Sequence, residues 1–204
     1  MRGGIMRRIF NLNSKISRMS TKTLVLIPIA VGINLIGGTL CTTLKLPLFL
    51  DMIGTIIVAC LAGPWSAAMS GVLTNIFLAV VASPVYLPYA VVSFLCSLVT
   101  GYLVKWGAFR NKAGIVLTWL SCALTNTISA SLVTLYVYGG ASGVNSTSVL
   151  TVTLLATTKK IFISVISSSM IENMIDKGVV FIIAFLIIDK LPRHFLNQYA
   201  TNLK

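Results

Sequence analysis

Carboxylates are the side chains of greatest chemical interest in this sequence, because an apolar chain of 204 residues contains four of them. Asp51 begins one apolar run, and Glu172 and Asp176 lie in another, where a spacing of four residues puts them on one helix face. A charge in an apolar segment is costly unless a ligand or a partner meets it. Two interpretations follow: structural ion pairs, for example with Lys45 or Lys177, or a pocket for a polar small molecule.

Three asparagines share a second pattern, since each has a small residue four positions before and after it. Small residues let helices approach closely, and an amide can bond across the interface. Packing alone explains this pattern, and we interpret Asn34 in that way. Asn75 and Asn126 could instead offer their donor and acceptor to a ligand in a pocket wall. The three stripes are Ala30-Asn34-Gly38, Gly71-Asn75-Ala79 and Cys122-Asn126-Ala130.

Tyrosines form the third group of candidates. Tyr86, Tyr89, Tyr136 and Tyr138 fall near the predicted outer face, where they either form an interfacial aromatic belt or stack on a ligand and cover it. We predict a substrate site that is open to the outside of the membrane. Its predicted residues are Asp51, Asn75, Tyr86, Asn126, Tyr138, Glu172, Asn173 and Asp176.

The elements that must position these side chains are membrane helices. The chain is 56% hydrophobic and 10% charged, with a mean hydropathy of +0.94, whereas a soluble domain has about 25% charged residues. At about 20 residues per span, roughly six spans fit and no soluble motor domain does. We predict an all-α bundle in residues 23–193, after a basic arm (1–22) and before a tail (194–204). The predicted spans are 24–41, 49–62, 65–82, 89–104, 113–138 and 170–191.

Two stretches depart from a regular span. Residues 49–62 are short for a membrane crossing and end in the turn Gly63-Pro64-Trp65. The Thr-rich residues 149–169 allow two interpretations, an interfacial segment or the start of a long last helix.

Basic residues predict the orientation. The net charge is +12, and six of the sixteen Lys and Arg residues lie in the first 22 positions. Basic residues collect on the cytoplasmic side of membrane proteins, so we predict that both termini are cytoplasmic. The basic residues assigned to the outer side are Lys45, Lys159, Lys160 and Lys177.

Catalytic and metal-binding patterns are missing from the sequence. The four cysteines are isolated in apolar runs, which predicts small buried side chains. The single histidine, His194, lies in the tail, and no nucleophile, zinc or phosphate-loop motif occurs. We expect neither an enzyme nor a bound cofactor.

The hairpin around Asp51, Gly63-Pro64-Trp65 and Asn75 resembles the substrate-binding S components of energy-coupling factor (ECF) transporters. The run 172–177, followed by Leu191-Pro192, resembles them too, with riboflavin-type and related vitamin S components as the nearest types. The resemblance implies a prokaryotic plasma-membrane protein that binds a vitamin near its outer face, in a cavity walled by spans 4 to 6.

The same resemblance implies partners. A transmembrane coupling protein, EcfT, and two ATPases, EcfA and EcfA′, would use ATP to topple the S component and deliver its substrate. The family's docking motif of spaced small residues corresponds here to Ala30, Gly32, Asn34 and Gly38, with asparagine in place of the second small residue. The alternatives are a proton-coupled carrier that uses Glu172 or Asp176, or a membrane enzyme or sensor.

Overall fold

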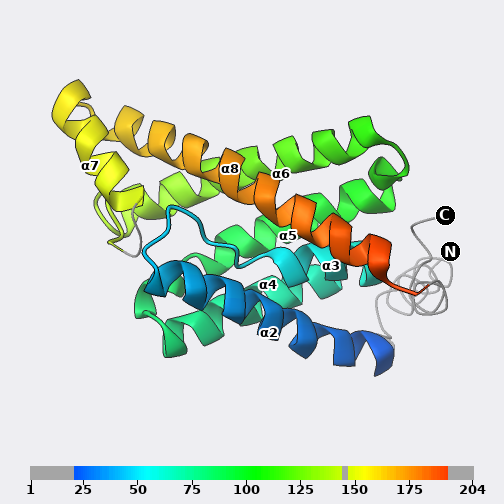
Figure 1. Cartoon of the computed structure of the whole chain (residues 1–204). Coiled ribbons are helices and arrows are strands. Elements are labelled where there is room, and N and C mark those ends of the chain that lie inside the picture. Colours follow the sequence, from blue (N-terminus) through cyan, green and yellow to red (C-terminus); the bar gives the residue numbers. More distant parts are fainter. Residues whose placement is uncertain (1–20, 144–146, 193–204) are drawn as a thin grey trace, which may run out of the picture.

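The structure is a computed structural model that describes residues 21–143 and 147–192, and the predicted arm and tail lie almost entirely outside them. The described residues form helices and loops, as predicted for an all-α chain (Figure 1). Two 3-10 turns, η1 (Pro84–Tyr86) and η2 (Ala108–Arg110), flank α5. The α-helices are α2 (Thr21–Thr43), α3 (Ile53–Ala62), α4 (Pro64–Val81), α5 (Ala90–Lys105), α6 (Lys112–Tyr136), α7 (Thr147–Thr158) and α8 (Ile161–Lys190).

The helices are arranged as one elongated bundle. The beginning of α2 and the end of α8 lie at the same end of it, and α7 lies at the opposite end (Figure 1). Helix α3 lies among the other helices, and nine of its ten residues are buried. At about 1.5 Å per residue it is roughly 15 Å long, half the thickness of a bilayer core of about 30 Å.

Among the described residues, three helices are long and apolar enough to cross a membrane, namely Thr23–Thr43, Pro64–Val81 and Ala113–Tyr136. The apolar helices α3, α5 and α7 are shorter. Large apolar side chains cover the outside of the bundle, and Val80, for example, is 81% exposed. An exterior of this kind suits contact with lipid. The count of six spans and the cytoplasmic termini stay predictions.

The turn at residues 63–65 is confirmed. Gly63 has φ +86°, and Pro64 occupies the first position of α4, where its missing N–H costs nothing. Gly54 lies so close to the backbone of Ala30 that a Cβ there would collide with it. Glycine at this position therefore lets α3 pack tightly against α2.

One predicted helix start is wrong. The second span was predicted from 49, but α3 begins at Ile53, because the backbone turns at Leu50 (φ +49°). The last span was clearest from 170, with a longer last helix left open, and α8 begins at Ile161, which agrees with the longer helix. Its serines do not break the helix, since the Ser164 hydroxyl donates to the carbonyl of Lys160 (2.9 Å). The undecided stretch contains both a separate helix, α7, and the start of α8.

Candidate functional site

Asp176 connects α8 to the α2–α3 connection, which we define as residues 44–52. Its Oδ1 accepts hydrogen bonds from the backbone N–H groups of Phe49 and Leu50, both at 2.9 Å. Its Oδ2 lies 2.6 Å from the Lys177 ammonium. Non-helical backbone inside an apolar bundle needs such partners. The interpretation as a structural pair is therefore confirmed for Asp176.

Lys177 was assigned to the outer side and named as a candidate partner for the carboxylates, and it is 1% exposed and lies inside the bundle. Its Nζ is 4.0 Å from Oδ1 of Asp51, which is too long for a direct hydrogen bond. Asp51 precedes α3 rather than beginning it, because the helix starts two residues later. The three side chains Asp51, Asp176 and Lys177 together contain two carboxylates and one ammonium.

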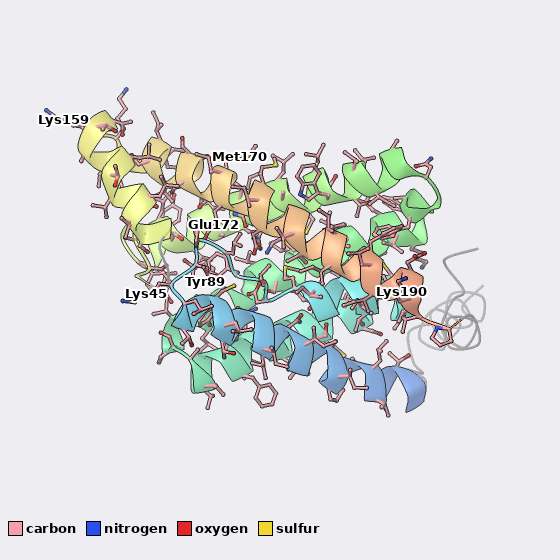
Figure 2. All side chains as sticks on the ribbon, in the orientation of Figure 1. Lys45, Tyr89, Lys159, Met170, Glu172 and Lys190 are labelled. Carbon is pink, nitrogen blue, oxygen red and sulfur yellow. The ribbon has the colours of Figure 1, made fainter. Side chains whose placement is uncertain are left out.

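A small cavity of about 40 Å³, the first chamber, lies beside Asp51. A second chamber of about 30 Å³ adjoins it, since Phe49, Tyr89 and Ala130 line both. Figure 2 shows Tyr89 and Glu172 toward the α7 end of the bundle, and Lys190 at the other end. The polar side chains of the first chamber are Asp51, Asn75, Tyr86, Tyr89, Ser93, Asn126 and Lys177. Those of the second include Thr134, Ser142, Thr151, Ser169, Glu172 and Asn173.

Asn75 has an unsatisfied acceptor in the wall of the first chamber. It is 1% exposed, and its Nδ2 donates to the carbonyl of Gly71 (3.1 Å) and to Oγ of Ser93 (2.6 Å). A carbonyl can only accept, so it fixes which end of the amide carries the nitrogen. Oδ1 then has no hydrogen-bond partner among the described residues. A buried acceptor in that state costs about 1–3 kcal/mol until a donor reaches it.

Asn126 and Asn173 form a bonded pair between the chambers. Nδ2 of Asn126 donates to Oδ1 of Asn173, whose own Nδ2 donates to the carbonyl of Ser169 (2.8 Å). Asn126 lines the first chamber and Asn173 the second. The Oδ1 of Asn126 accepts from the thiol of Cys96 (3.3 Å). Both predicted asparagines therefore border the chambers while they tie α6 to α8.

The tyrosines divide into different roles. Tyr86 is buried in the first chamber, and its hydroxyl bonds Thr42 (2.6 Å). Tyr138 was predicted to bind substrate, but it lines neither chamber. It stacks on Tyr89 instead, with the ring centroids 5.9 Å apart. Tyr136 is 83% exposed, as the belt interpretation requires.

Sequence reasoning left three polar lining residues out of the predicted site, namely Tyr89, Ser93 and Lys177. Tyr89 had been considered with the belt, and Ser93 follows it by four residues, a spacing that places both on one side of α5. That spacing is a signal that could have identified them. The position of Lys177 could not be recognised in this way, because it depends on the packing of α8 against the α2–α3 connection.

The predicted docking residues are mostly inside the protein. Ala30 and Asn34 are 2% and 0% exposed, and Gly38 is also buried. The short helix α3 packs on this small-residue face of α2, so the face cannot meet a partner in this structure. Gly32 alone of the four is partly exposed, with open space where a side chain would lie, and docking there stays a prediction. The packing role of Asn34 is confirmed.

The four cysteines are buried free thiols, as predicted. In the described ranges, no three or more His, Cys, Asp or Glu side chains are grouped to hold a metal ion.

One comparison with known proteins gives a match. The family model described as "ECF transporter, substrate-specific component" matches residues 22–188, which include every lining residue of both chambers. No curated protein and no solved structure matches the chain.

Proposed function

The chain belongs to the family of ECF transporter substrate-specific components, and on this premise we propose that it captures a small water-soluble nutrient, such as a vitamin, for import. Proteins of this family are transporter subunits rather than enzymes. The observation that carries the proposal is the unpaired Oδ1 of Asn75, a buried residue that lines a cavity beside the Asp51 carboxylate. An apolar bundle keeps such groups at a cost, and a ligand with donors removes that cost.

The two chambers support a site that rearranges when it fills. Each holds about 40 Å³ or less, whereas pockets for small molecules measure about 300–1,000 Å³. Phe49 of the α2–α3 connection and the ring of Tyr89 line both chambers and so lie where the two adjoin. We propose that these two elements move aside for the nutrient and close over it.

Transport requires further subunits in this proposal. Six crossings with both termini in the cytoplasm would place the chambers toward the outside of a prokaryotic plasma membrane. EcfT would contact the outer face of α2 near Gly32, and EcfA and EcfA′ would hydrolyse ATP to topple the bundle.

Ala130 provides a test, because it lines both chambers. The protein is purified in lipid nanodiscs, and retained small molecules are released and identified by mass spectrometry. We expect the wild type to retain one nutrient and Ala130→Phe to lose it. Ala113→Phe, at an exposed position of the same helix, is the matched control and should retain it. Retention of the same compound by Ala130→Phe at the wild-type ratio would contradict the proposed site.

The proton-coupled carrier is distinguished by its energy source. Asp176 already accepts two backbone N–H groups and pairs with Lys177, which supports a structural role for it. We expect uptake into proteoliposomes to require EcfT, the ATPases and ATP. Uptake by the chain alone under a proton gradient would favour the carrier.

A further inference from the structure

We propose that the nutrient is an organic cation whose protonated nitrogen lies in the first chamber, between the Asp51 carboxylate and Oδ1 of Asn75. This inference rests on the proposed function and names the chemical class of its substrate.

The charges around the first chamber do not balance. Asp51 and Asp176 share one ammonium, that of Lys177, and it lies 2.6 Å from Asp176 but 4.0 Å from Asp51. Within the described residues, no other cation lies at ion-pair distance from Asp51. A buried carboxylate without a close partner is costly in a bundle of this kind. A second cation beside Asp51 would neutralise the group.

Asn75 adds an acceptor to the same chamber. Because the carbonyl of Gly71 fixes the direction of the amide, Asn75 presents Oδ1 and not a donor. An ammonium has several N–H donors and can satisfy Oδ1 and the Asp51 carboxylate together. A carboxylate or phosphate group would be repelled by Asp51 and would leave Oδ1 unpaired.

Two aromatic rings complete the surroundings. Tyr86 and Tyr89 line the first chamber, and cations are attracted to aromatic faces. Tyr138 stacks on Tyr89 with the two rings nearly parallel, at an interplanar angle of 7°. Lys177 is the one feature that favours an anion, but its charge is engaged by Asp176, and an anion would have to displace that contact.

The second chamber suits the rest of the molecule. Besides the Glu172 carboxylate, its wall contains groups that both donate and accept hydrogen bonds, including Thr134, Thr151 and Ser169. A neutral portion with hydroxyl or ring-nitrogen groups would pass Tyr89 and bind there.

The test compares three probes that differ in one group, benzylamine as its ammonium, benzyl alcohol and benzoate. Binding to the protein in nanodiscs is measured by calorimetry at pH 7. We expect benzylammonium to bind at least tenfold more tightly than the other two. Asp51→Asn should abolish this preference, and Asn75→Ala should reduce it. Asp189→Asn removes the same charge at an exposed position and should preserve it.

Three results would overturn the inference: no binding of benzylammonium, equal or tighter binding of the alcohol or benzoate, or a preference that Asp51→Asn leaves intact. The proposed function fails separately. If the wild type retains a neutral or anionic nutrient and Ala130→Phe loses it, the inference of a cationic substrate is contradicted, but the proposed capture site is supported.

Discussion

Two buried asparagines, Asn34 and Asn75, occupy matching positions in their sequence stripes but differ in how fully they are bonded. Asn34 is 0% exposed, and its Nδ2 donates to the hydroxyls of Thr55 (2.8 Å) and Thr74 (2.9 Å), while its Oδ1 accepts from the N–H of Gly54 (2.7 Å). Asn75 is 1% exposed, and its Oδ1 has no partner in the described structure.

This difference in hydrogen bonding distinguishes a residue that stabilises the fold, Asn34, from a candidate binding residue, Asn75. The Asn34 cluster joins α2, α3 and α4 with every amide group satisfied, so it stabilises the bundle. The Asn75 cluster borders a cavity and leaves an acceptor open, which supports the proposed ligand site. Burial and residue type are the same in both, and the count of satisfied hydrogen bonds is what distinguishes them.

The largest loss of stability is expected on replacing a buried charged side chain whose hydrogen bonds are all made. Asp176→Ala would leave the ammonium of Lys177 without its closest partner and two backbone N–H groups unpaired. Loss of one partner of a buried pair costs about 3–5 kcal/mol. We expect little folded protein after extraction, measured by size-exclusion chromatography and thermal unfolding. Asp189→Ala, which is exposed, should behave like the wild type. A normal yield and melting temperature of Asp176→Ala would show that these buried hydrogen bonds do not stabilise the fold.

The same substitution at the two asparagines tests the comparison directly. Asn34→Leu removes an acceptor from Gly54 and a partner from two threonines, and should lower stability by about 1–3 kcal/mol. Asn75→Leu also removes the open acceptor and should cost less, but it should weaken nutrient binding about tenfold or more. Thermal unfolding and calorimetry measure the two effects. Equal destabilisation by both variants, with equal binding, would remove the distinction.

The smallest effect on the isolated protein is expected at Gly32, which belongs to neither cluster. Space is open beside it, so Gly32→Leu should change the stability and nutrient affinity little. If EcfT contacts α2 there, co-purification with EcfT should fall. Ile36→Leu, on an exposed position one turn later, is a size-conserving control. If Gly32→Leu co-purifies with EcfT as well as the wild type does, this face of α2 is not the docking surface.

Local patterns predicted the parts of the fold that depend on short-range chemistry. The turn at Gly63 and Pro64, the buried cysteines and the packing of Asn34 follow from residue types and spacing. The connection to Asp176 could not be predicted in this way, because Phe49 lies 127 residues away from it in sequence. The same long-range contact brings Lys177 inside the bundle, although Lys177 itself was among the partners that the sequence suggested for the carboxylates.

Two adjacent residues of α8 contact the α2–α3 connection. Asp176 accepts hydrogen bonds from backbone N–H groups of the connection, and Lys177 lies 4.0 Å from the side chain of Asp51. These contacts join the connection to α8, so we expect a shift of α8 along its axis to move the connection with it. A subunit that pushes on α8 at its Lys190 end is then expected to displace the wall of the first chamber from a distance.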